Sequence, residues 1–154
     1  MPKGRGMEPK LHVRRLDVSD IGLILASDAF DNQPDPNWTQ AFFAEPGHLI
    51  YGAIDGAHLV GFASGTILLH PDKPPSLFIN EVAVNPAFRR RGIATNLCET
   101  LISGGREHGC EGVWLATEVK NEAARALYRA LAGRETAGIV VFDWDYAMGQ
   151  PMSG

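Results

Sequence analysis

The sequence predicts an α/β domain with a central mixed, mostly antiparallel β-sheet that is flanked by helices. Several apolar runs of strand length lie between turn residues, and two later segments repeat apolar residues at helical spacing. Asp55-Gly56 is a strong hairpin turn signal between two of the apolar runs. The length of 154 residues is ordinary for one domain. We expect a single domain at residues 11–148, with flexible tails at 1–10 and 149–154.

The first part of the chain predicts a strand, two helices and a loop. Residues 12–16 are expected to form the first strand. A helix then begins at a capping side chain, which is Asp17, Ser19 or Asp20. Residues 31–37 contain two prolines and form a loop, and a short helix follows near residues 38–44.

The middle of the chain predicts three strands. Residues 49–54 and 59–69 flank the Asp55-Gly56 turn, and the second run is long enough to be a long or bulged strand. Residues 70–75 hold three prolines and cannot join a ladder. Residues 77–84 are a further apolar strand.

The last part of the chain predicts alternating helices and strands. A helix is expected from about residue 92 to 108, then a strand at 113–117. A second amphipathic helix has an apolar stripe at residues 124–131 and stops at Gly133. A last strand is expected at residues 139–146.

Composition excludes several classes of function. The 14 Lys and Arg residues against 18 Asp and Glu give a net charge of −4, so we expect no nucleic-acid partner. A mildly acidic surface suits a cationic substrate. No apolar run approaches the ~20 residues that span a bilayer, and no signal peptide follows the basic first ten residues. We therefore expect a cytoplasmic protein without a membrane partner.

The two cysteines indicate neither a disulfide framework nor a metal site. Cys98 and Cys110 lack the close spacing of metal-binding pairs, and we expect free, partly buried thiols. No other cluster of ligand residues is visible, so no metal is expected.

The most informative segment is residues 80–94, where an apolar strand enters a basic loop that opens a helix. The first turn of a helix has unpaired N–H groups and a partial positive charge, which together form an anion site. Arg89, Arg90 and Arg91 add charge beside Gly92, which lets a ligand approach the backbone closely. Three adjacent arginines are more often a solvated surface run, but the strand-loop-helix setting favours a pyrophosphate site.

This segment resembles the GCN5-related N-acetyltransferase (GNAT) family, whose pyrophosphate loop has the pattern Arg/Gln-x-x-Gly-x-Gly/Ala. Residues 89–94, Arg-Arg-Arg-Gly-Ile-Ala, match that loop, and residues 121–128 resemble the family's Asn-x-x-Ala-x-x-Leu-Tyr helix. The resemblance implies a GNAT fold with splayed strands at an acetyl-CoA site, and an acetyl-CoA-dependent acyltransferase. Members of this family are commonly dimers, so a homodimer is possible.

The resemblance also implies roles for particular residues. Glu81 is the expected base that removes a proton from the amine, and Tyr128 the expected acid for the leaving thiolate. Without the resemblance, Glu81 is a solvent-facing strand residue and Tyr128 a core residue. The expected acetyl-CoA contacts are Val82, Ala83, Val84, Arg89, Arg90, Arg91, Gly92, Ile93, Ala94, Thr95 and Asn121.

Within the family, the chain looks like the type I aminoglycoside 3-N-acetyltransferases, which have Asp at the position of Glu81. Asp143 and Asp145 alternate with aromatic residues, so both are expected on one strand face. With Asp31 and Asp35 they are candidates to bind a polycationic aminosugar, although an amphipathic strand with a solvated face explains the same pattern. A polyamine or other small amine is the alternative acceptor. A CoA-binding module without catalysis is the alternative function.

Overall fold

A computed structural model describes residues 11–148 of the chain. These residues divide into two compact units, 11–116 and 117–148. The prediction of one domain at 11–148 therefore stays a prediction, and both predicted tails lie outside the described residues. None of the described helices is long and apolar enough to cross a membrane.

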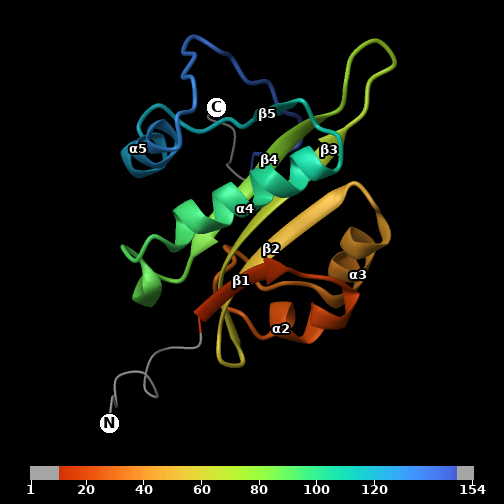
Figure 1. Cartoon of the computed structure of the whole chain (residues 1–154), viewed down its shortest axis with the longest axis vertical. Helices are drawn as coiled ribbons and strands as arrows, with labels where there is room; N and C mark the ends of the chain where they lie inside the picture. Colours follow the sequence, from red (N-terminus) through yellow and green to blue (C-terminus); the bar gives the residue numbers. More distant parts are fainter. Residues whose placement is uncertain (1–10, 149–154) are drawn as a thin grey trace. The chain divides into compact units, whose positions relative to one another are not determined.

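The first unit is built on a five-stranded sheet in which spatial order follows chain order (Figure 1). The strands are β1 (Leu11–Arg15), β2 (His48–Asp55), β3 (His58–Leu68), β4 (Ser76–Val84) and β5 (Gly112–Trp114). Strands β1 to β4 form antiparallel pairs, and β5 joins β4 in parallel. The predicted mixed, mostly antiparallel sheet is confirmed, with β5 shorter than the expected strand at 113–117.

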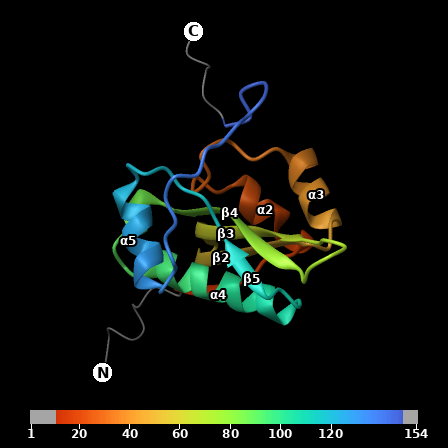
Figure 2. The ribbon, with the colours of Figure 1, turned by 90° about the horizontal axis from the view of Figure 1, so that it is seen from above.

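Helices cover both faces of this sheet. The 3-10 helix η1 (Val18–Asp20) leads into α2 (Ile21–Leu25), and α3 (Pro36–Ala44) follows the predicted loop. The 3-10 helix η2 (Pro86–Phe88) comes before α4 (Ile93–Glu107). Figure 2 shows α4 against one face of the sheet and α2 and α3 on the other.

Each face of the sheet has its own hydrophobic core. The core under α4 includes Leu77 and Ile79 of β4 with Leu97 and Leu101 of the helix, all buried. The core on the other face includes Phe62 of β3, which stacks on Phe30 with ring centroids 4.0 Å apart. Both cysteines are free thiols, as predicted, and both are buried rather than partly buried.

The start of the first helical region is fixed by a local network of charges. Asp17 caps η1 by accepting the Ser19 N–H, and Asp20 accepts the Asp17 N–H in return. Arg14 reaches the two carboxylate oxygens of Asp20 from β1, at 2.8 and 2.9 Å. This contact joins the first strand to the helical segment that carries one wall of the pocket described below.

The second unit contains one helix, α5 (Glu122–Ala130). Arg125 and Arg129 both bind the Glu135 carboxylate, each at 2.7 Å. The helix ends as expected near Gly133, whose N–H donates to the Tyr128 carbonyl.

The predicted last strand at residues 139–146 is wrong. An alternating pattern says which side chains would share a face, but a strand forms only where another strand pairs its backbone. Among residues 11–148, no strand pairs with this segment. Asp145 and Tyr146 have φ values of 57° and 62°, which turn the chain. Asp143 and Asp145 therefore do not project from one strand face, and Asp143 instead accepts the Met148 N–H.

Candidate active site

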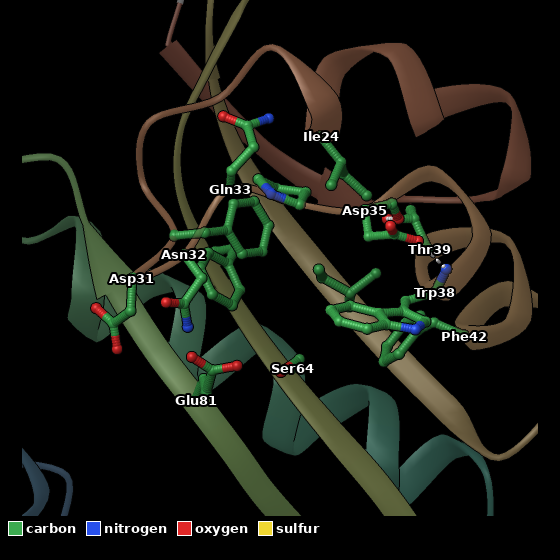
Figure 3. Close-up of a pocket in the computed structure, with 14 residues that line it drawn as sticks. Ile24, Asp31, Asn32, Gln33, Asp35, Trp38, Thr39, Phe42, Ser64 and Glu81 are labelled. Carbon is green, nitrogen blue, oxygen red and sulfur yellow. Dashed lines mark hydrogen bonds between the residues drawn. The ribbon is translucent and has the colours of Figure 1, made fainter. Parts of the chain in front are cut away.

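A pocket of about 340 Å³ opens in the first unit, on the sheet face that α2 and α3 cover (Figure 3). Its walls come from α2, α3, the loop between them and strands β2, β3 and β4. Three of the predicted site residues, Asp31, Asp35 and Glu81, line it together. The remaining lining residues are Ile24, Phe30, Asn32, Gln33, Pro34, Trp38, Thr39, Phe42, Ile50, Phe62 and Ser64.

A β-bulge turns Glu81 toward this pocket. Ser64 pairs with Glu81 and Gly65 with Ile79, so Asn80 is an extra residue on β4. Before the bulge, Ile79 packs in the core under α4, whereas after it Val82 packs there instead. Because one inserted residue exchanges the two faces of a strand, Glu81 lies on the pocket face. In a regular strand without the bulge, Glu81 would share the face of Ile79 and point into the core under α4.

The environment of Glu81 suits a proton acceptor. Much of the residue remains accessible, but the pocket walls partly desolvate its carboxyl group. This desolvation, followed by the negative charge of Asp31, raises the pKa of Glu81 above its ordinary value of 4.5. A carboxylate with a raised pKa holds a proton more tightly and is a better general base near neutral pH.

The two other acids in the pocket differ in what they can offer a ligand. Asp35 caps α3, because its carboxylate accepts the Trp38 N–H at 2.9 Å. Asp31 makes no hydrogen bond or ion pair within residues 11–148. Asp31 and Glu81 lie on the same side of the pocket in Figure 3, so this side carries the free negative charge.

The predicted pyrophosphate loop forms the turn before α4. Gly92 is the N-cap of this 15-residue helix, and no side chain caps the amides of its first turn. Its φ of 76° is left-handed, which favours glycine, and a Cβ built at Gly92 meets no atom within 4 Å. Among the described residues, the first turn of this helix therefore has amides without a side-chain cap and open space beside Gly92.

The arginines before Gly92 are held in different ways. Arg89 donates to the Val84 carbonyl from its Nε, at 3.2 Å. The Arg91 guanidinium lies 5.0 Å from the centre of the Phe88 ring. Arg90 has a left-handed φ of 64° and makes no hydrogen bond or ion pair in the described chain. Three arginines therefore directly precede the helix start in the chain, and Ile93, Ala94 and Thr95 form its first turn.

Strand β4 leaves part of its edge open beside this loop. Pairing between β4 and β5 covers only residues 76–78 and 112–114. From Ile79 onward β4 pairs with β3 alone among the described strands. Residues Val82, Ala83 and Val84 therefore lie on a stretch of β4 that splays away from β5, with no described strand paired to one edge.

The other predicted site residues lie in the second unit; they are Asn121, Tyr128, Asp143 and Asp145. Asn121 caps α5 by accepting the Ala124 N–H at 3.1 Å. Tyr128 lies on the same helix, one turn before its end. Asp143 and Asp145 lie in the irregular segment beyond it.

Sequence reasoning missed several residues that line the pocket. Phe30 and Phe62 were not singled out as site residues, and Trp38 only marked the start of a predicted helix. Ser64 was not singled out, because a serine within an apolar strand gives no signal until its partner across the ladder is known. Within residues 11–148, no group of three or more His, Cys, Asp or Glu side chains is arranged to hold a metal ion.

Comparisons with known proteins agree with this geometry. A family model described as the acetyltransferase (GNAT) family matches residues 18–133. L-2,4-diaminobutyric acid acetyltransferase from Nocardia farcinica is 33% identical over 100 residues, which cover 65% of this chain and 49% of the relative. Aminoglycoside N(6')-acetyltransferase type 1 from Salmonella typhimurium is 28% identical, over 54% of this chain and 60% of the relative. The chain thus spans about half to three fifths of these two relatives.

A solved structure has the same fold. The aminoglycoside acetyltransferase meta-AAC0020, from an uncultured soil metagenomic sample, superposes with a TM-score of 0.74. The match covers 87% of this chain and 95% of that one, at 21% sequence identity. The bulged and splayed β4, the glycine turn before α4 and the family match over residues 18–133 lead to one assignment. The chain belongs to the acetyltransferase (GNAT) family.

Proposed function

We propose that this protein is an acetyl-CoA-dependent N-acetyltransferase that acts on a primary amine of a small cationic molecule. One observation carries the proposal. A single strand, β4, places Glu81 in a pocket on one sheet face and then runs through η2 into the uncapped start of α4. A proton acceptor and an anion site therefore follow each other along one continuous backbone segment.

The loop before α4 fits a pyrophosphate. Its features are the uncapped helix amides, the open space beside Gly92 and the neighbouring guanidinium groups. Residues 89–95 are the proposed contacts for the diphosphate of coenzyme A. The open edge of β4 at residues 82–84 is the proposed contact for its pantetheine arm, and Asn121 a further contact. When bound, acetyl-CoA supplies the acetyl group as a thioester.

Glu81 would act as the general base. Most alkylamines are protonated near pH 7, and an amine must lose its proton before it can act as a nucleophile. The Glu81 carboxylate takes that proton, either directly or through a water molecule. Asp31 attracts the ammonium group to the same side of the pocket before the proton leaves. The hydroxyl of Tyr128 is the proposed proton donor to the leaving sulfur.

No covalent acetyl-enzyme is part of this proposal. Cys98 and Cys110 are both buried, and burial raises the pKa of the Cys98 thiol to about 11 and also raises that of Cys110. Such thiols are poor nucleophiles near neutral pH. Attack by the amine within a ternary complex is the mechanism that the site supports.

Two classes of acceptor are compatible with this chemistry. An aminoglycoside, acetylated at the 3-N position, is the class that the sequence resemblance implies, although the Salmonella typhimurium relative is named for the 6' position. A smaller amine is the second class, and the relative from Nocardia farcinica is named for diaminobutyric acid. Free, buried thiols suit the reducing cytoplasm, which is the proposed location.

The test compares wild-type protein with Glu81→Gln in an assay of free thiol release from acetyl-CoA. Glutamine keeps the size of the side chain but cannot take a proton. We expect kcat/KM to fall by about 100-fold or more, while the Kd for CoA, measured by calorimetry, stays unchanged. An unchanged pH–rate profile in the variant would remove Glu81 from the role of base.

A further inference from the structure

The pocket has two chemically different sides. Asp31 and Glu81 lie together on one side of Figure 3, and Trp38 and Phe42 lie on the other. The first side is the proposed site of acetyl transfer. The second side lies away from the free carboxylates. Its residues determine which chemical groups the acceptor can carry beyond its reacting amine.

The polar groups beyond the acidic side are already engaged by the protein. The Asp35 carboxylate accepts the Trp38 N–H, and the Thr39 hydroxyl donates to the Asp35 carbonyl at 2.7 Å. The Gln33 amide donates to the Leu25 carbonyl at 3.0 Å. Among the described residues, the Asp35 carboxylate is the one charged group that lines this side, and one of its oxygens already accepts a backbone N–H.

Ser64 adds a free polar group on the acidic side. It pairs with Glu81 across the β3–β4 ladder, and only 5% of its surface is exposed. No residue in the range 11–148 forms a hydrogen bond with its hydroxyl. No fully buried polar side-chain atom among the described residues lacks a partner, so the Ser64 hydroxyl is reached from the pocket that the residue lines and is a candidate partner for a ligand amine beside Glu81.

Apolar side chains form the remaining wall. Ile24, Ile50 and Phe62 are buried beneath the pocket, and Phe30 stacks on Phe62. Trp38 lines the same pocket with 77% of its surface exposed. An indole at the edge of an apolar pocket gains contact area when a ligand with its own apolar surface enters.

We propose that the acceptor is a primary amine with one charged end and an apolar body of about the size of one ring, which packs against Trp38, Phe30 and Phe42. This inference rests on the proposed acetyl transfer and names its substrate class. The ammonium group meets Asp31, Glu81 and the Ser64 hydroxyl, and the apolar body covers the opposite wall. A polycationic acceptor would place its further charges against this wall, where Asp35 is the one acidic side chain among the lining residues.

The proposal is tested with four acceptors and three variants. The acceptors are 2-phenylethylamine, ethylamine, spermidine and kanamycin, compared at equal concentrations of free amine. Burial of a phenyl ring should raise kcat/KM for 2-phenylethylamine over ethylamine by about tenfold or more. Trp38→Ala should raise KM for 2-phenylethylamine by about two- to tenfold and leave its kcat unchanged, because the contact is remote from the reacting atoms.

Leu69→Ala is the matched control. Leu69 is also 77% exposed, but it does not line the pocket. Its removal should change neither kcat nor KM. As a measure of binding without turnover, 2-phenylethylamine should change the tryptophan fluorescence of the wild-type protein, and Trp38→Phe should abolish that change although Trp114 and Trp144 remain.

The possible failures are distinguishable. Faster turnover of kanamycin or spermidine than of 2-phenylethylamine overturns the substrate class and leaves the acetyltransferase proposal intact. A rise in KM for 2-phenylethylamine that is equal in Trp38→Ala and Leu69→Ala also overturns it. Failure to bind CoA, together with no turnover of any amine, overturns the proposed function and this inference with it.

Discussion

Gly92→Ala separates the effect of the predicted pyrophosphate turn on folding from its effect on binding. Gly92 has a φ of 76°, and an added Cβ would meet no protein atom within 4 Å. The change therefore introduces backbone strain but no clash. We expect the free energy of unfolding to fall by about 1 kcal/mol, which leaves the fold intact.

The same methyl group should weaken CoA binding much more than it weakens the fold. It would stand in the open space beside the uncapped amides of α4. Loss of one hydrogen bond to a charged phosphate is worth about 1.5–3 kcal/mol, so the Kd for CoA should rise by about tenfold or more. Urea denaturation gives the stability, and titration calorimetry gives the Kd.

Gly56→Ala is the control for strain. Gly56, in the turn between β2 and β3, has a φ of 62°, and its Cβ would also meet nothing within 4 Å. The free energy of unfolding of Gly56→Ala should fall by an amount similar to that of Gly92→Ala, while the Kd for CoA stays at the wild-type value. Equal CoA affinity in the two variants would refute the assignment of the α4 N-terminus as the pyrophosphate site.

Two further predictions concern charged side chains. The negative charge of Asp31 raises the pKa of Glu81, so Asp31→Asn should shift the acidic limb of the plot of kcat/KM against pH to lower pH. An acidic limb at the same pH in wild type and variant would contradict this effect of Asp31 on Glu81. The hydrogen bond from Arg14 lowers the pKa of Asp20 below its ordinary 3.8, so this stabilisation is complete above pH 3.8 and is lost as pH falls through the lowered value. Asp20→Asn should therefore lower the free energy of unfolding at pH 7 by about 1–2 kcal/mol. In urea denaturation, this difference between variant and wild type should shrink below pH 4.

The sequence predicted the parts of the fold that depend on local patterns. The strand that ends at Val84, the turn at Gly92 and the amphipathic helix after it were all found near their predicted positions. The Asp55-Gly56 turn and the long β3 strand were also found. These features depend on residues close together in the chain, where turn preference and periodicity act directly.

Features set by contacts between distant segments were harder to predict. The bulge at Asn80 decides which face Glu81 occupies, and it is identified only from the pairing with Ser64 and Gly65. The apolar alternation at 139–146 looks like a strand, yet no described strand pairs with it. Trp38 gained its place in the pocket from the packing of α3, which no local pattern reports.

The most direct measurement follows both products of one reaction, with purified protein, acetyl-CoA and 2-phenylethylamine. Mass spectrometry of the amine and a thiol assay of the cofactor should show equal amounts of N-acetylated amine and free CoA, with no acetyl group left on the protein. Release of CoA without any acetylated amine, or an acetyl group retained on the protein as an obligatory intermediate, would contradict direct transfer within a ternary complex.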